Sequence, residues 1–203
     1  DVTATTTQAI SVVSIKAVFS ENSWPDIIAA VHNKEVPDTW NVGDSCNMTI
    51  NNKTYAIDII GKNHDDYADG SGKAPLTFQM HTTYATQYKM NGAESNSCGW
   101  VNCLVRTYNA FPKLRQVMPA EVVAAMKAVT KKTSAGNASS AIDTTEDTLF
   151  LLSEIEVQGT RTYSYAGEGT QYEYYKTAAN RKKNRAWYLR SPRLNSTTCF
   201  DRT

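Results

Sequence analysis

Two strand-like runs on either side of Asn51-Asn52 constrain the fold more than any other feature of this sequence. Residues 46–50 and 54–61 are rich in β-branched and apolar side chains, which alternate with polar ones over much of their length. Two such runs joined by an Asn-Asn pair are typical of a β-hairpin. Because the strands of a hairpin run antiparallel, the chain is expected to build an antiparallel sheet.

A clear helix signal stands before that hairpin. Ser23 can cap a helix, Asp26 follows at the third position as in a capping box, and Pro25 lies in the first turn, where its missing N–H costs nothing. A helix is therefore predicted from this point to about Asn33. Two further helices are predicted to begin at Gly99-Trp100 and at Pro119, the second including Val129 and ending with Lys131 and Lys132.

More strands are expected at residues 76–80, 148–157 and 187–192. Short strands mixed with two or three helices predict an α+β fold with a twisted, mainly antiparallel sheet. Residues 1–22 are interpreted as an extended arm that joins a preceding domain or adds a strand to a neighbour, and residues 23–203 as one domain. Since the first residue is an aspartate and not methionine, the chain is interpreted as processed or as an excerpt.

Composition argues against two classes of function. Lys+Arg is 21 against Asp+Glu 20, a formal charge of +1, whereas nucleic-acid-binding proteins usually show a strong basic excess. No apolar run approaches the roughly 18 residues that a membrane-spanning helix needs. Neither nucleic-acid binding nor membrane insertion is therefore expected. Thr, Ser and Asn make up 54 of the 203 residues, a bias that suits turns, exposed strands and contact surfaces.

The sequence offers little for catalysis or metal binding. It contains no nucleophile elbow, zinc-protease, P-loop or dinucleotide-binding motif. The spacing of Cys98 and Cys103 is not that of a zinc site. These two cysteines, like Cys46 and Cys199, are interpreted as buried or half-buried thiols. Disulfides, or a redox pair formed by Cys98 and Cys103, are the alternatives. Residues 64–70, HDDYADG, lack the EF-hand spacing, so a solvated turn is preferred there to a Ca²⁺ site. No catalytic residue, metal or cofactor is predicted.

Five segments, in this order and spacing, resemble an uncharacterised domain family of bacteria and phages. The family usually has WWLRSP in the last segment, where Tyr188 here replaces the second Trp. The segments are WNVGD (40–44), IIGKNHDD (59–66), GWVNCLVR (99–106), LFLLSEIEV with AGEGTQYEYY (149–157 and 166–175) and WYLRSP (187–192).

The resemblance implies a setting and a fold. Members of that family occur as surface proteins of Gram-positive bacteria, in prophages and in virion proteins. Their last segments resemble the C-type-lectin-like fold shared with formylglycine-generating enzymes and with the variable proteins of diversity-generating retroelements. The family continues past its LRSP segment to a closing motif that this chain lacks, so the closing strands are expected to be missing or to come from a second chain.

The WYLRSP segment is expected to serve the structure. Arg190 would pair inside the domain with a carboxylate or with strand carbonyls, and Glu168 and Glu173 are its candidate partners. Trp187, Arg190 and Glu168 are therefore the predicted structural anchors. A guanidinium that binds a ligand is the alternative for Arg190.

Candidate ligand contacts come from two segments. Residues 163–175 carry five tyrosines together with small polar residues, a mix typical of binding loops, and Tyr172 and Tyr174 are the candidates there. Inward packing of some of these tyrosines is the alternative. Lectin-like folds usually expose their variable ligand surface after the LRSP segment, so the resemblance adds Arg193, Asn195, Thr197 and Thr198.

These observations predict a non-catalytic module displayed on a surface, most simply a phage virion protein of a fibre, a tail or a capsid decoration, or a bacterial surface protein. It would bind a host-surface glycan or protein, associate with other virion or cell-surface subunits, and form a homo-oligomer. The alternatives are a purely structural virion subunit and an enzyme related to formylglycine-generating enzymes. The charge run at residues 181–185 is interpreted as a solvated loop, with a contact to phosphates or to an acidic partner as its alternative.

Overall fold

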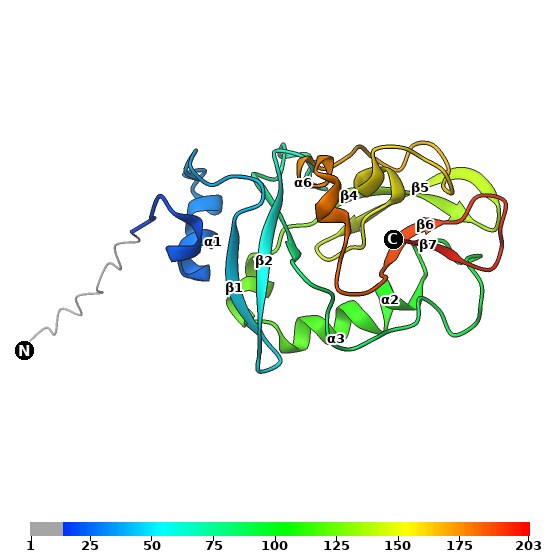
Figure 1. The fold of residues 1–203 in the computed structure, drawn as a ribbon, viewed down its shortest axis with the longest axis horizontal. Helices are drawn as coiled ribbons and strands as arrows, with labels where there is room; N and C mark the ends of the chain where they lie inside the picture. Colours follow the sequence, from blue (N-terminus) through cyan, green and yellow to red (C-terminus); the bar gives the residue numbers. More distant parts are fainter. Residues whose placement is uncertain (1–13) are drawn as a thin grey trace, which may run out of the picture.

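The computed structural model describes residues 14–203, and the part of the predicted arm before residue 14 lies outside the described residues (Figure 1). The α-helices are α1 (Trp24–His32), α2 (Leu104–Thr107), α3 (Ala110–Val117), α4 (Ala120–Ala125), α5 (Glu154–Gln158) and α6 (Glu173–Lys176). The strands are β1 (Ser45–Ile50), β2 (Lys53–Lys62), β3 (Leu76–Met80), β4 (Val129–Gly136), β5 (Ser139–Asp147), β6 (Tyr188–Pro192) and β7 (Phe200–Arg202). Two 3-10 helices are η1 (Phe19–Glu21) and η2 (Ala178–Arg181).

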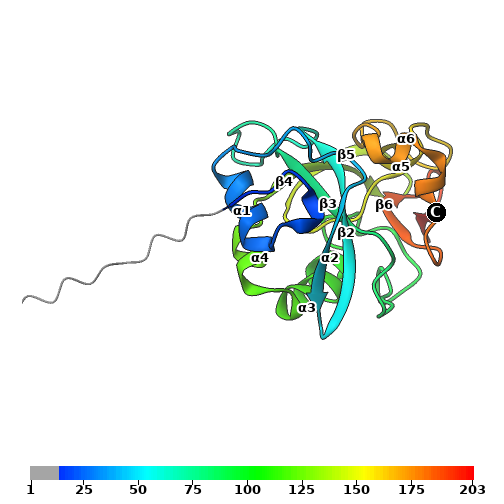
Figure 2. The same ribbon diagram turned by 60° about the vertical axis from the view of Figure 1, so that its left-hand side comes forward.

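Mixed helices and antiparallel strands confirm the predicted α+β class. Among the described residues the strands form three small sheets, in the orders β1-β2-β3, β4-β5 and β6-β7. In Figure 1, α1 and strands β1 and β2 lie toward one end of the molecule and the β6-β7 hairpin toward the other, and Figure 2 also shows α1 and β6 on opposite sides. None of the described helices has the length and apolar character needed to cross a membrane.

The predicted hairpin and the first helix are confirmed. Residues Asn51 and Asn52 join β1 to β2 with φ angles of 49° and 58°, the left-handed region that asparagine tolerates in two-residue hairpin turns. Ser23 and Asp26 form the expected capping box at the start of α1. Both features are local, since each depends on residues within four positions of one another.

The expected helix after Pro119 is wrong in its second half. Helix α4 ends at Ala125, and Val129 begins strand β4, which pairs along its length with β5. The strand buries Lys131, Thr133 and Ser134. Lys131 is therefore not a solvated residue at a helix end, and its ammonium group has partners inside the protein.

The strand predicted over residues 148–157 is also wrong. Residues 148–153 form no regular element, and residues 154–158 form helix α5. Ser153 and Glu156 make a second capping box, and Gly159 ends the helix in the left-handed conformation with φ 73°. This serine–glutamate spacing, with a glycine after it, is the sequence signal for a helix that the strand prediction overlooked.

The domain starts earlier than the predicted boundary at residue 23. Phe19 is buried and its ring lies 5.1 Å from that of Trp40, in an edge-on arrangement. The indole nitrogen of Trp40 donates to the carbonyl oxygen of Lys16 at 3.0 Å. Ile15 packs against the same core cluster. Residues 15–22 therefore belong to the folded body, not to an extended arm.

Candidate functional site

A buried ionic cluster beside strand β6 joins residues from both halves of the chain. Arg190 is completely buried, and its guanidinium forms two hydrogen bonds with the carboxylate of Glu156, one of them at 2.9 Å. It also donates to the carbonyl oxygens of Leu151 at 2.8 Å and Glu168 at 3.0 Å, and to the hydroxyl of Thr133 at 2.9 Å. The prediction that Arg190 is an internal anchor is confirmed.

The carboxylate partner of Arg190 is Glu156, not either of the two predicted glutamates. Glu168 offers only its backbone carbonyl to Arg190, while its side chain accepts from the backbone N–H of Ser134 at 2.8 Å and from the hydroxyl of Ser191. Burial raises the pKa of the Glu168 carboxyl. Glu173 is exposed and pairs with Lys176. Glu168 remains a buried structural residue, but through hydrogen bonds to β4 and β6.

Two cations hold Glu156 in its charged form. Burial alone would raise the pKa of Glu156, but the adjacent charges of Arg190 and Lys131 lower it to about 2. The ammonium of Lys131 also bonds Asp65 and the hydroxyl of Tyr172, the latter at 2.7 Å. Each charge in the cluster therefore has a partner of opposite sign, as burial requires.

The same cluster corrects two predictions. Asp65 lies in the HDDYADG segment, yet it is buried and accepts hydrogen bonds from Lys131, Thr77 and Tyr172. That segment is therefore not a fully solvated turn, although Asp66 and Asp69 in it are exposed. Tyr172 has 0 % exposure, so it is not available to a ligand, and burial also raises the pKa of its hydroxyl well above the usual range.

Tyr174 is likewise not a surface contact. It is 6 % exposed, and its hydroxyl donates to the buried Asp58 carboxylate at 2.7 Å. Asp58 also accepts from the hydroxyl of Ser45 and lies 2.8 Å from Nδ1 of His81. The described residues place no nucleophile within hydrogen-bond distance of the other ring nitrogen of His81. The ring of Trp187, the third predicted anchor, is half-buried and stacks on Tyr175 with centroids 6.4 Å apart.

The four other predicted ligand contacts are all exposed, on the loop between β6 and β7. This loop, residues 193–199, contains Arg193, Asn195, Thr197 and Thr198. Asn96 is completely buried and holds the loop from beneath. Its backbone N–H donates to the carbonyl of Thr197 at 3.0 Å. Its side-chain amide donates to the carbonyls of Ser196 at 2.9 Å and Cys199 at 2.8 Å.

A tyrosine that the sequence did not single out completes this surface. The guanidinium of Arg193 lies 4.5 Å from the ring centroid of Tyr163, and the backbone N–H of Leu194 donates to the Tyr163 carbonyl. Tyr163 is 49 % exposed, and its own backbone N–H donates to the buried Glu154 carboxylate at about 3 Å. We call Tyr163 together with residues 193–198 the loop surface.

No disulfide joins the four cysteines, all of which lie in the described part of the chain. Cys46 and Cys103 are buried, whereas Cys98 and Cys199 are half-buried, which confirms their interpretation as thiols. Burial raises the pKa of Cys103 to about 11, so it is a neutral thiol near pH 7 and a poor nucleophile. Within residues 14–203 no group of His, Cys, Asp or Glu side chains has the arrangement of a metal site.

Comparison with known protein families decides where the chain belongs. Residues 75–201, more than half of the sequence, match a family described as a domain of unknown function, DUF6273. The chain belongs to this family. No curated protein matches it, and no solved structure does.

The DUF6273 segment is not the whole of the folded body. It includes Arg190, Glu156, Lys131 and the entire loop surface, but Asp65 lies before its first residue. Since Lys131 bonds Asp65 in the interior, the ionic cluster crosses the boundary of the matched segment. The hydrogen bonds of Asn96 and Glu154 to the loop surface lie entirely within the DUF6273 segment.

Proposed function

We propose that this chain is a non-catalytic binding module of C-type-lectin-like architecture, displayed on a phage virion or a bacterial surface, that contacts a host-surface glycan or protein through its loop surface. The virion or surface setting rests on the resemblance of the WYLRSP and related segments. The observation that carries the binding role is an exposed loop that is fixed from below by the buried Asn96.

A preorganised loop suits recognition. Ordering a mobile loop on binding costs free energy, and a loop already held by three hydrogen bonds from one buried residue avoids much of that cost. The exposed side chains are also of the types that bind well. Arginine and tyrosine are enriched among residues that dominate binding energy, and threonine and asparagine add adaptable hydrogen bonds.

The buried charges support a structural role over catalysis. Glu156, Arg190, Lys131 and Asp65 neutralise one another in the interior, so none of them faces a surface where a substrate could bind. The thiol of Cys103 is held neutral near pH 7 by burial. His81 has the carboxylate partner of a general base but no neighbouring nucleophile among the described residues.

Binding to cells tests the proposal. Purified protein is applied to a glycan array and to a panel of bacterial cells, as the parent and as a variant with Arg193→Ala, Thr197→Ala and Thr198→Ala. We expect the variant to lose at least about tenfold in affinity, because an arginine and two hydroxyls are removed from the contact. The matched control carries Lys34→Ala and Thr49→Ala, two exposed residues in the α1 and β1 region, and should bind as the parent does. Equal binding by the two variants would contradict the proposal.

A further inference from the structure

The charges of this chain are segregated along its length. Between Lys176 and Cys199 the sequence holds seven Lys or Arg residues and no Asp or Glu. Of the 21 basic residues this leaves 14 in the rest of the chain, against all 20 acidic ones. The formal charge of +1 therefore conceals a strongly basic segment, which is the kind of asymmetry that indicates an anionic partner.

Some of these cations are engaged within the protein, and some are not. Arg190 is buried against Glu156, Lys176 pairs with Glu173, and the ammonium of Lys183 lies 5.2 Å from the ring of Tyr174. In contrast, Lys182, Arg185 and Arg193 are exposed, as is Arg202 just beyond this segment, and none of the four forms an ion pair with any described residue, although Arg193 lies over the ring of Tyr163.

The exposed cations lie on β7 and on the segments that flank β6. Tyr188 at its start is the cross-strand neighbour of Arg202 on β7, and both side chains are exposed. Arg193 directly follows the strand, five residues after Tyr188. At the usual rise of a β-strand, the Cα atoms of these two residues are about 16 Å apart. Arg185 precedes the strand by three residues, in the connector from α6. We call Lys182, Arg185, Tyr188, Arg193 and Arg202 the basic band.

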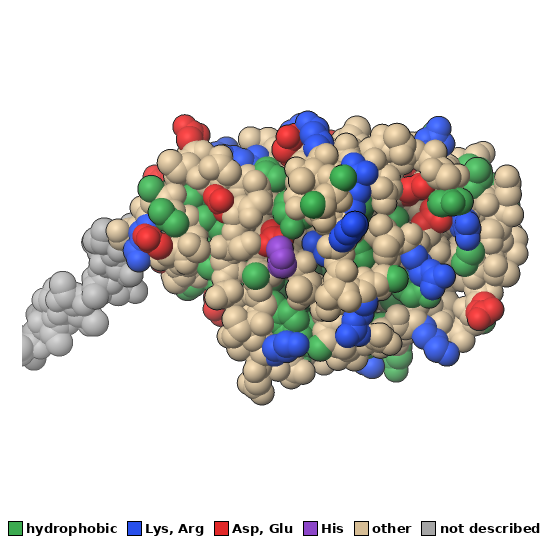
Figure 3. Space-filling model, in the orientation of Figure 1, with side chains coloured by type: hydrophobic (Ala, Val, Ile, Leu, Met, Phe, Trp, Pro, Cys, Tyr) green, Lys and Arg blue, Asp and Glu red, His purple; other side chains and the backbone are tan. Residues whose placement is uncertain are grey.

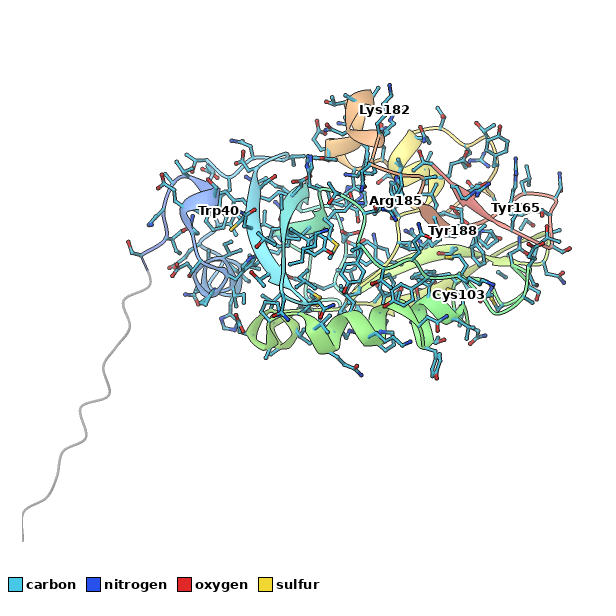
Figure 4. All side chains as sticks on the ribbon, turned by 60° about the horizontal axis from the view of Figure 1, so that its bottom comes forward. Trp40, Cys103, Tyr165, Lys182, Arg185 and Tyr188 are labelled. Atoms are coloured by element: carbon cyan, nitrogen blue, oxygen red, sulfur yellow. The ribbon has the colours of Figure 1, made fainter. Side chains whose placement is uncertain are left out.

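The band is a fixed part of the surface. The connector is tied down by Asn184, whose side-chain oxygen accepts hydrogen bonds from the backbone N–H of Thr83 at 3.0 Å and from its hydroxyl at 2.8 Å. In Figure 3, Lys and Arg side chains lie over the region of α6, the connector and the β6-β7 hairpin, with acidic side chains beside some of them. Lys182, Arg185 and Tyr188 follow one another along this part of the chain in Figure 4.

We propose that the basic band binds an anionic glycan, a polysaccharide that carries sulfate, phosphate or carboxylate groups along its length. This inference rests on the proposed binding function and names the class of its ligand. The band shares Arg193 with the loop surface, so one extended polysaccharide contacts both surfaces. Arginine matches such oxyanions through two parallel N–H donors, and three of the four exposed cations are arginines.

Aromatic side chains favour a glycan over a nucleic acid. Tyr188 is 38 % exposed between the cations, and Tyr163 is 49 % exposed under Arg193. Each ring offers an apolar face beside charged groups, which suits a sugar ring whose substituents are anionic.

Binding to heparin, used as a sulfated polysaccharide probe, tests the inference. We expect the parent protein to bind heparin but not neutral dextran, with an affinity that falls as salt is raised. Arg185→Gln with Arg202→Gln should weaken binding by at least about tenfold, because two charge-assisted contacts are lost. The matched control, Lys16→Gln with Lys34→Gln, removes two exposed charges near α1 and should change the affinity less than about twofold.

Tyr188 separates sugar recognition from charge attraction alone. Tyr188→Ala should weaken heparin binding, and Tyr188→Phe, which keeps the ring, should retain most of it. Equal losses in the arginine variant and the lysine control would overturn the inference, as would equal affinity for single-stranded DNA of matched charge. Adhesion to cells that depends on residues 193–198, without heparin binding, would leave the proposed function standing and refute only the anionic ligand. Retained melting temperatures would show that the variants are folded.

Discussion

At the scale of single residues, the buried charges determine how this protein is stabilised. Arg190 donates six hydrogen bonds in the interior, two of them to Glu156, and the rest to three backbone carbonyls and a hydroxyl. Only a guanidinium has the planar, forked geometry for this set, since an ammonium has three donors around one point. The position therefore requires arginine and not merely a positive charge.

Arg190→Lys is expected to lower the free energy of unfolding by about 3 kcal/mol, because part of the Glu156 carboxylate would be left buried without its partner. Urea denaturation followed by circular dichroism measures this difference. Arg193→Lys, an exposed arginine three residues away, should cost less than about 0.5 kcal/mol. Similar losses at the two positions would show that the fork geometry at Arg190 is unimportant.

Asp201 is the buried carboxyl that lacks a full set of partners. Its Oδ2 atom is buried without a hydrogen bond from any described residue. Burial, with the nearby carboxylate of Glu154, raises the pKa of Asp201 to about 7. In the unfolded chain an aspartate titrates near a pKa of about 3.9. Between these two values folding takes up a proton, so this residue makes the protein less stable as the pH rises from about 4 to about 7.

Asp201→Asn should remove that dependence. Asparagine keeps the shape without the charge, so the variant is expected to be more stable than the parent at pH 8, with a much smaller gain at pH 4. The free energy of unfolding in urea at the two pH values tests this. Glu146→Gln, at an exposed carboxylate on β5, serves as the control and should change stability equally at both. An Asp201→Asn gain that is the same at pH 4 and pH 8 would refute the titration of Asp201.

At the scale of elements, the helix and turn that depend on neighbouring residues could be predicted from the sequence. The strand that depends on interior contacts between distant residues could not. The capping box at Ser23 and the turn at Asn51-Asn52 need only neighbouring residues, so the sequence shows them directly. The sequence favours a helix end for Lys131, because lysine is common there. Lys131 lies in a buried strand because Asp65 and Glu156, 66 and 25 residues away, neutralise it. Such partners cannot be identified from one sequence.

The residues of the candidate site could likewise be predicted from the sequence only in part. Arg190 could be predicted as an anchor, since a charge in an apolar segment needs an internal partner, but the choice of Glu156 depends on how α5 packs. The composition around Tyr172 and Tyr174 favours a binding role, but the fold turns both side chains inward onto Asp65 and Asp58. Tyr163, in the same stretch, is the exposed one.

The loop between β6 and β7 owes its shape to Asn96. Asn96→Ala removes the side-chain donors to the carbonyls of Ser196 and Cys199 and the acceptor for the backbone N–H of Asn137. We expect amide hydrogen exchange across residues 193–199 to accelerate by at least about tenfold, because the loop would open locally without global unfolding. Exchange in β1 and β2 should stay as in the parent.

Hydrogen exchange read by mass spectrometry can localise this effect. Asn41→Ala is the control, since Asn41 is an exposed asparagine whose side chain donates to the carbonyl of Thr39. If residues 193–199 exchange at the parent rate in Asn96→Ala, the loop is fixed by other contacts. The argument for a preorganised binding surface would then lose its main support.

At the scale of the whole molecule, the DUF6273 segment and the folded body differ in extent. Strand β3 begins at residue 76, inside the matched segment, but its partner β2 lies before it. The ionic cluster likewise draws Asp65 from the region before residue 75. A fragment cut at the limits of the match therefore breaks a sheet and a buried ion pair together.

We expect the fragment 75–201 not to fold cooperatively. It would leave Lys131 buried without Asp65, a change that costs about 3–5 kcal/mol on its own, and would expose the apolar face of β3, where Phe78 stacks on Phe19. The stability of a domain of this size is typically about 5–15 kcal/mol, so these losses together are enough to unfold it. Thermal unfolding followed by circular dichroism should show one sharp transition for the 203-residue chain and none for the fragment. A sigmoidal melt of the fragment would show instead that the DUF6273 segment is an independent domain, with α1, β1 and β2 as an addition to it.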